Sequence, residues 1–319
     1  MTRSAKVLRV LGLLAWLALP ATGIAQEAAT ASGAAAPKAT YSRKGADTCI
    51  ACHDDGKTLS IFRTPHAQRS DERTPFGHGN LQCEACHGAG GAHSARIRSG
   101  QPRPPIPNFD DESKVPVGVQ NDACLACHKG DMRHGWTGSS HERNGLSCAG
   151  CHSSHATRDA VLVQARQSEV CYGCHKQQQA EARLPSAHPL QEGKMACTSC
   201  HDAHGTIADA NLRKTTLNDT CYSCHADKRG PFLWEHAPAA EDCSSCHKPH
   251  GSTQPALLTQ RAPMLCQQCH SQAGHPSLPV SSSYVAGGPA STYLLGGSCM
   301  NCHSQVHGSN HPSGAKLGR

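Results

Sequence analysis

The sequence has few of the side chains that usually build a hydrophobic core. Its 319 residues include only 4 Phe, 5 Tyr, 3 Trp and 5 Met, against 30 Gly and 20 Pro. Large buried apolar side chains normally supply the free energy that offsets the conformational entropy lost on folding. A conventional globular core is therefore excluded, and something other than side chains must fill the interior.

Long apolar runs are also scarce. Near the N-terminus, three basic residues (Arg3, Lys6 and Arg9) precede a short apolar run and a cluster of small residues. This order predicts a secretory signal over residues 1–25, because the apolar run is too short to cross a bilayer comfortably. Residues 26–44 are rich in alanine and are expected to form a flexible tether. We therefore expect an exported chain that enters a membrane only with a partner.

Cysteine, in contrast, is abundant and strictly arranged, since all 20 cysteines fall into ten copies of Cys-x-x-Cys-His. Two thiols three residues apart can each form a thioether to a porphyrin, and the next histidine then lies beneath the iron as its proximal ligand. The predicted attachment cysteines are Cys49, Cys52, Cys83, Cys86, Cys124, Cys127, Cys148, Cys151, Cys171, Cys174, Cys197, Cys200, Cys221, Cys224, Cys243, Cys246, Cys266, Cys269, Cys299 and Cys302. The predicted proximal ligands are His53, His87, His128, His152, His175, His201, His225, His247, His270 and His303. The pattern predicts ten covalently bound c-type haems (heme c) with their iron.

Three other kinds of site use paired cysteines: zinc sites, thioredoxin-like redox pairs and structural disulfides. None of them requires a histidine directly after the second cysteine. Here every pair carries that histidine and no cysteine is left over, so haem attachment is the interpretation that the whole pattern favours.

The remaining 13 histidines contain a second set of candidate iron ligands. One series lies between the two motifs of a pair, 13 residues after the first proximal histidine in three cases, and a second series follows the second motif by three to six residues. The predicted distal ligands are His66, His93, His141, His155, His188, His204, His236, His250, His275 and His307. His78, His134 and His311 fall outside both series and are expected to be solvated or bonded to propionates.

These histidines divide the chain into five units, each with two haem motifs. Neighbouring units of a repeat array bury faces against each other, so the predicted fold class is a multihaem cytochrome c, mostly coil with short α-helices, in an elongated array of five dihaem units. The decahaem domain is predicted over residues 45–308, followed by a tail at 309–319. The proline-rich segment 101–119 is expected to run extended over the haems. The units are predicted at 47–93, 122–155, 169–204, 219–250 and 265–307.

A histidine three residues after a proximal ligand cannot reach the far face of the same porphyrin, so it must serve another haem. Within unit two, the sequence favours a crossed arrangement in which His155 ligates the first haem and His141 the second. The few methionines leave bis-histidine ligation as the expectation throughout, which closes every iron. An electron-transfer protein is therefore expected, and an enzyme is not.

The net charge of +6 does not indicate nucleic-acid binding. Each haem would bring two propionates, so the loaded protein would be net negative, and its basic residues are expected to pair with propionates or face solvent.

Ten such motifs in a chain of this length, with repeats such as Ser140-His141-Glu142-Arg143-Asn144-Gly145-Leu146-Ser147-Cys148-Ala149-Gly150-Cys151-His152-Ser153-Ser154-His155, resemble the MtrA/PioA/DmsE family of periplasmic decahaem cytochromes. The resemblance covers essentially residues 45–308. It implies a haem wire inside an outer-membrane β-barrel porin, linking a periplasmic or inner-membrane electron carrier to an extracellular cytochrome, reductase or metal-oxidising partner. It also implies a periplasmic protein held at the outer membrane by the porin.

Two alternatives belong to other classes. A soluble periplasmic shuttle or store would feed a reductase without entering a porin. A catalytic multihaem oxidoreductase would need one haem with an open face, often marked by Cys-x-x-Cys-Lys or a missing distal histidine, and neither mark occurs.

Overall fold

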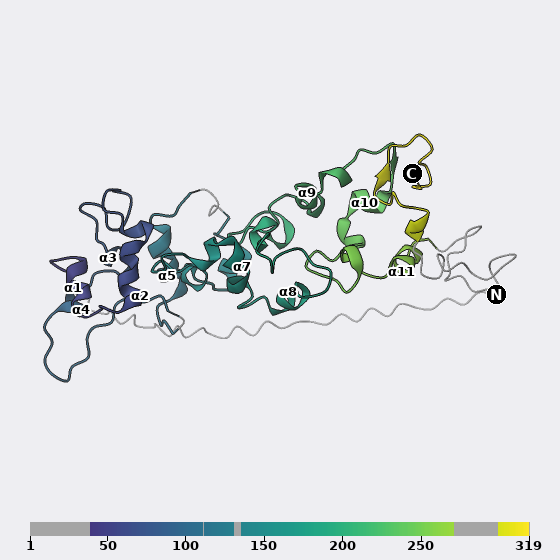
Figure 1. Ribbon diagram of the computed structural model, residues 1–319. Helices are drawn as coiled ribbons and strands as arrows, with labels where there is room; N and C mark the ends of the chain where they lie inside the picture. Colours follow the sequence, from purple (N-terminus) through teal and green to yellow (C-terminus); the bar gives the residue numbers. More distant parts are fainter. Residues whose placement is uncertain (1–38, 111, 131–134, 271–298, 319) are drawn as a thin grey trace, which may run out of the picture. The chain divides into compact units, whose positions relative to one another are not determined.

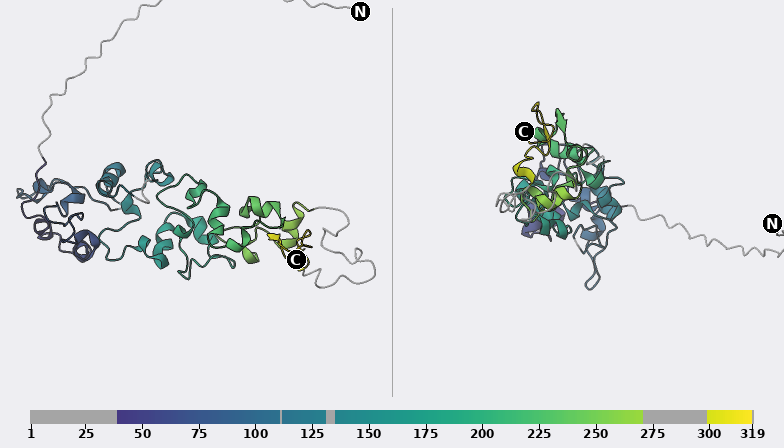
Figure 2. Two further views of the ribbon diagram at one scale, coloured as in Figure 1. Left: turned by 90° about the horizontal axis from the view of Figure 1, so that it is seen from above. Right: turned by 90° about the vertical axis from the view of Figure 1, so that its right-hand side faces the viewer.

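The computed structural model describes residues 39–110, 112–130, 135–270 and 299–318. In these parts the chain consists of short helices joined by turns and irregular segments, as Figures 1 and 2 show. The longest described helix, α5 (Val117–Leu125), has nine residues. The prediction of mostly coil with short α-helices is confirmed. The predicted signal at 1–25 lies outside the described residues, as does most of the predicted tether, and the elongated array stays a prediction.

The helices and strands follow one another along the whole described chain. The other α-helices are α1 (Ala46–Ile50), α2 (Gly56–Leu59), α3 (Glu84–His87), α4 (Gly91–Ser94), α6 (Ser140–Arg143), α7 (Gln164–Cys171), α8 (Lys176–Glu181), α9 (Leu217–Tyr222), α10 (Ala237–Glu241) and α11 (Ala262–Gln267). The 3₁₀ turns are η1 (Ser60–Arg63), η2 (Pro65–Ala67), η4 (Cys148–Gly150), η5 (Ala160–Leu162), η6 (Cys197–Ser199), η7 (Asp209–Asn211), η8 (Ala226–Lys228), η9 (Cys243–Ser245), η10 (Pro255–Leu257) and η11 (Cys299–Asn301). The strands are β1 (Trp234–Glu235) and β2 (Gly308–Ser309).

Each haem motif forms one helical turn. In all ten motifs the backbone N–H of the histidine donates to the carbonyl oxygen of the first cysteine, at 2.8–3.0 Å. The first cysteine of each odd-numbered motif lies in an α-helix, namely α1, α5, α7, α9 or α11, whereas the even-numbered motifs form α3 or a 3₁₀ turn. This local bond places both thiols and the imidazole on one turn, as the spacing of the motif requires.

A buried amide side chain ties the two motifs of a unit together. Asn121, one turn before Cys124, accepts the backbone N–H of Cys148 at 2.8 Å. Asn218 binds the backbone N–H of Cys243 in the same way at 2.9 Å. Both amides are at most 8% exposed, so each bond holds the start of the second motif against the helix of the first.

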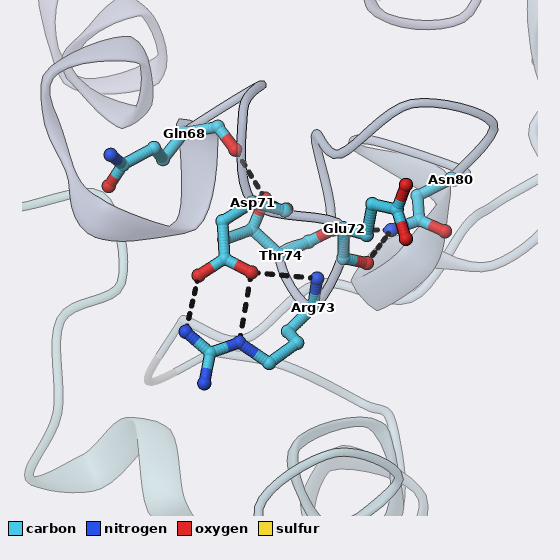
Figure 3. A network of polar contacts seen from close by, with 6 residues as sticks. All are labelled: Gln68, Asp71, Glu72, Arg73, Thr74 and Asn80. Atoms are coloured by element: carbon cyan, nitrogen blue, oxygen red, sulfur yellow. Dashed lines mark hydrogen bonds and ion pairs between the residues drawn. The ribbon is translucent and has the colours of Figure 1, made fainter.

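Few apolar side chains are buried, as the composition predicts. The buried hydrophobic residues in the described chain are Ala46, Ile61, Phe76, Trp136, Ala182 and Ala196. Three of them, Ala46, Ile61 and Phe76, form a small cluster in unit one. Polar contacts complete that unit: Asp71 accepts two bonds from the Arg73 guanidinium, and the nearby loop is closed by side-chain bonds to backbone carbonyls (Figure 3).

Neighbouring units contact each other through backbone at close range. Ser186 and Ser252 exchange two backbone hydrogen bonds of 3.1 and 2.8 Å, and a side chain at Gly251 would collide with the carbonyl of Glu181. At the C-terminal end, β1 and β2 pair antiparallel, with Trp234 opposite Ser309. Strand β2 therefore crosses the predicted boundary at 308, and residues of the predicted tail pack against unit four.

Among the described residues, no helix is both long and apolar enough to cross a bilayer.

Candidate haem sites

Nine predicted proximal histidines each face one predicted distal histidine. In every pair the ring centroids lie 6.0–6.4 Å apart. The pairs are His53 with His93, His128 with His66, His87 with His155, His175 with His141, His152 with His204, His225 with His188, His201 with His250, His270 with His236 and His247 with His307.

This spacing fits an iron between two imidazoles. Metal–imidazole bonds are about 2 Å long, and each ring adds roughly 1 Å from nitrogen to centroid, so two rings on one iron have centroids about 6 Å apart. Rings in direct van der Waals contact would lie closer when stacked. The nine pairs thus have the geometry of bis-histidine haem ligands.

The partners differ from the crossed arrangement within one unit that the sequence favoured. His155 faces His87 in unit one, at 6.3 Å, and not His128. His141 faces His175 in unit three, at 6.2 Å, and not His152. That expectation was wrong: in the described pairs, the histidine between two motifs faces the first motif of the following unit. In units two to five the histidine after the second motif faces the preceding unit, whereas in unit one His93 faces His53 of the same unit.

Hydrogen bonds explain why the partner comes from the neighbouring unit. The Nδ1–H of His141 donates to the carbonyl of Ala203 at 2.7 Å, and Ala203 directly precedes His204, which itself faces back to His152. His188 donates in the same way to Pro249 at 2.9 Å, and His236 to Val306 at 2.8 Å. In each case the acceptor directly precedes the distal histidine of the next unit, so one short segment orients two ligands.

When Nδ1 carries the proton and donates it in a hydrogen bond, the tautomer of the ring is fixed and the unprotonated Nε2 is available for iron. Among the proximal histidines of even-numbered motifs, His87, His201, His247 and His303 donate Nδ1–H to backbone carbonyls at 2.6–2.8 Å. His152 is different, because its Nδ1 lies 2.8 Å from the carboxylate of Asp159.

The proline-rich segment supplies two of these carbonyls. Pro107 accepts from His87 and Pro104 from His93, both at 2.8 Å. Arg103 also donates to the carbonyl of His93, at 2.6 Å. The sequence predicted only that the segment runs over the haems. Its role in orienting two ligands could not be found there, because backbone carbonyls carry no residue signature.

The thiols form one continuous series along the chain. Within a unit, the first cysteines of the two motifs interact: burial raises the pKa of Cys83 to about 11, with Cys49 adding to the shift, and raises that of Cys221 to about 12, with Cys243 adding to it. Between neighbouring units, the second cysteines of the two adjoining motifs interact instead. Burial raises the pKa of Cys86, and Cys127 of the next unit adds to the shift.

The same alternation continues to the last motif. Between units, Cys174 acts on Cys151, Cys224 on Cys200 and Cys269 on Cys246, in each case adding to a pKa raised by burial. Within the remaining units, Cys124 interacts with Cys148, Cys171 with Cys197 and Cys266 with Cys299. From the first motif to the tenth, a thiol of each motif is therefore within electrostatic reach of a thiol of the motif that follows it in sequence. None of the 20 cysteines, all of them described, is in a disulfide.

Two buried donors offer an independent test of whether haem fits. The Trp136 indole N–H and the Tyr172 hydroxyl are buried without a hydrogen-bond partner among the described residues. Trp136 lies edge-on to His204, with centroids 6.3 Å apart. Burial raises the pKa of Tyr172, and the thiols of Cys197 and Cys171 add to the shift. Both donors thus lie beside predicted attachment sites, where a haem propionate would accept them.

The remaining histidines agree with the sequence analysis where they are described. His78 is exposed, on the loop that precedes Cys83. His311 is also exposed, and its Nδ1 accepts the backbone N–H of Ser313 at 3.2 Å. His134 and His275, the latter a predicted distal ligand, lie outside the described residues.

Comparisons with known proteins agree with the geometry. A family model described as "Doubled CXXCH motif" matches residues 188–230 and 236–275, and one described as "Cytochrome c-type protein NrfB-like" matches residues 83–165. The chain is 44% identical over 282 residues to multiheme cytochrome MtrA of Shewanella baltica (strain OS185), which covers 88% of this chain and 83% of that protein.

The chain belongs to the MtrA family of multihaem cytochromes. It is also 29% identical over 147 residues to cytochrome c-type protein NrfB of Haemophilus influenzae (strain ATCC 51907 / DSM 11121 / KW20 / Rd), covering 41% of this chain and 65% of that protein. The membership and the motifs together make this MtrA-family chain an electron-transfer cytochrome with covalently bound c-type haems.

Proposed function

We propose that the protein is a decahaem conduit that carries electrons through an outer-membrane porin. The observation that supports it best is the series of ten motifs, in which a thiol of each motif lies close enough to a thiol of the next motif in sequence to shift its pKa. Such a series gives an electron one path, with an entry at each end.

The haems would be held by the chain's own residues in three ways. The paired cysteines form the thioethers, the facing histidines such as His87 and His155 ligate the iron from both sides, and the Nδ1 acceptors hold the rings in orientation. When bound, the haem supplies one-electron chemistry at a low potential, because bis-histidine ligation gives lower potentials than Met/His ligation. Closed irons leave no position for a substrate, which favours transfer over catalysis.

The porin is proposed from the resemblance to the MtrA/PioA/DmsE family, in which the cytochrome lies inside a large barrel. Irregular backbone has polar groups that lipid cannot hydrogen-bond, and a barrel would present the lipid-facing surface in its place. The proposed location is periplasmic, at the outer membrane. The proposed partners are a periplasmic or inner-membrane electron carrier and an extracellular cytochrome, reductase or metal-oxidising protein.

Liposomes that contain the porin and an internal redox dye provide the test. The dye should be reduced or oxidised by an external partner only when the cytochrome is present in the porin. Loss of the fourth haem, through Cys148→Ala and Cys151→Ala, should abolish most of this transfer because it interrupts the series. His78→Ala is the matched control and should transfer normally. Transfer that is equally fast without the cytochrome would contradict the conduit and favour the soluble shuttle.

A further inference from the structure

The fourth haem site differs from its counterparts in the group that accepts the Nδ1 proton of its proximal histidine. Nδ1 of His152 donates to Oδ2 of Asp159 at 2.8 Å, whereas the corresponding His201 and His247 donate to the neutral carbonyls of Ala210 and Ala256. The Asp159 side chain is only 14% exposed. A carboxylate in this position is therefore both close and sheltered from water.

The length of the loop that follows the motif explains why a carboxylate replaces a backbone carbonyl as the acceptor. After His201 and His247 the chain folds back, and each histidine forms a bridge with a leucine, Leu212 or Leu258. In those loops Ala210 and Ala256 adopt left-handed φ values of 52° and 54°, which turn their carbonyls towards the rings.

The loop after His152 is one residue shorter up to its own leucine, Leu162. None of residues 153–163, all of which are described, has a positive φ. Without a left-handed residue, no backbone carbonyl in this loop turns towards the His152 ring, and the carboxylate of Asp159 accepts its Nδ1 proton instead.

A second carboxylate lies on the opposite side of the same site. Oδ1 of Asp202 is 3.7 Å from Nδ1 of His204, the ring that faces His152 at 6.1 Å. Asp202 is held there because its Oδ1 also accepts the backbone N–H of His204 at 3.0 Å. Trp136, only 7% exposed, packs edge-on against His204 and limits access of water.

We propose that Asp159 and Asp202 set the potential of the fourth haem, holding it below the value that carbonyl acceptors would give. This inference rests on the proposed ligation of that haem by His152 and His204. A carboxylate that accepts the Nδ1 proton raises the basicity of the imidazole, and a more basic, more negative ligand stabilises ferric over ferrous iron. A carboxylate also lies beside the distal ring of the sixth site, where Oε2 of Glu181 is 3.4 Å from Nδ1 of His250, so the acceptor on the proximal side is what distinguishes the fourth site.

The test is a spectroelectrochemical titration of the intact, fully loaded protein and four variants. Asp159→Asn keeps the shape and an oxygen acceptor but removes the charge. The component of the titration that belongs to one haem, about a tenth of the absorbance change, should move to a higher potential. The shift should correspond to at least a tenfold change in the reduction equilibrium, which is about 59 mV for one electron. Asp202→Asn should move the same component in the same direction by less, because its carboxylate is farther from the ring. Asp159→Glu should restore most of the wild-type curve.

Asp209→Asn is the matched control, since it removes the same charge from the corresponding loop of unit three, where the side chain is exposed. Its titration should superimpose on that of the wild type. Electron paramagnetic resonance adds a readout that a structural role would not move: one low-spin ferric signal should change its g values in Asp159→Asn only.

The outcomes separate this inference from the proposed function. Variants that retain ten low-spin haems and wild-type titrations would overturn the inference alone, as would a shift of equal size in Asp209→Asn. If Asp159→Asn fails to load all its haems, the Asp202→Asn titration decides, and an unchanged curve there also overturns the inference. A wild-type protein that carries fewer than ten haems would instead contradict the proposed function.

Discussion

Replacement of His66 by alanine tests ligand exchange between units. Its ring centroid lies 6.0 Å from that of His128 in the next unit, whereas exchange within the unit would pair it with His87. Loss of the imidazole opens one face of one iron in ten. About a tenth of the ferric absorbance should therefore become high-spin, and about one carbon monoxide should bind per reduced protein, because six-coordinate bis-histidine haem has no free position.

The identity of the opened haem distinguishes the two pairings. In a background with Cys124→Ala and Cys127→Ala, which lacks the third haem, His66→Ala should add no further carbon monoxide site. In the matched background with Cys83→Ala and Cys86→Ala, which lacks the second haem, it should still add one. Intact mass must show nine haems in both backgrounds. The reverse pattern, with the new site lost together with the second haem, would refute the pairing between units.

The other predictions address cofactor load, unassigned histidines and pH. The mass of the exported protein should exceed that of its polypeptide by ten haems, as measured by mass spectrometry. All haems should be low-spin, as measured by absorbance spectroscopy. His78→Ala and His311→Ala should leave the spectrum unchanged, whereas His275→Ala should create one high-spin haem. Glu84 is buried, which favours a higher pKa, but bonds from Gly90 and Ser42 outweigh this and lower its pKa. It therefore stabilises unit one above the pKa of an unfolded glutamate, an effect lost as pH falls through its folded pKa. The protection of the Gly90 amide against exchange, relative to its intrinsic rate at each pH, should fall in acid, and Glu84→Gln should remove that dependence.

The sequence predicted which histidines face each other because covalent attachment fixes one member of each pair. Two thioethers and an iron ligand require one fixed spacing, and with few methionines in the chain the second ligand is expected to be a histidine that recurs with the motif. Nine of the ten predicted distal histidines lie opposite a predicted proximal one. The short helices also follow from the motif, since its own histidine-to-cysteine bond makes one turn and little else extends it.

The pairing could not be predicted in the same way. A distal histidine such as His155 is barred from its own haem, yet the sequence does not say which neighbour it serves. That choice depends on where the next unit places a carbonyl, such as that of Ala203 beneath His141. Backbone acceptors have no residue signature. Asp159 is the exception, because at His152 a side chain and not a backbone carbonyl accepts the Nδ1 proton, and a side chain can be recognised in the sequence.

Unit one departs from this pairing between neighbouring units, because its last histidine, His93, faces His53 in the same unit at 6.3 Å. By analogy with unit one, we expect His275, which lies outside the described residues, to serve His303 in its own unit. Every predicted ligand is then used once. Under the proposed ligation, the interior units would close their irons only with both neighbours, and metal bonds would join the units in addition to their packed surfaces. An array built in this way should fold and unfold as a whole, unlike repeats that share only surface contacts.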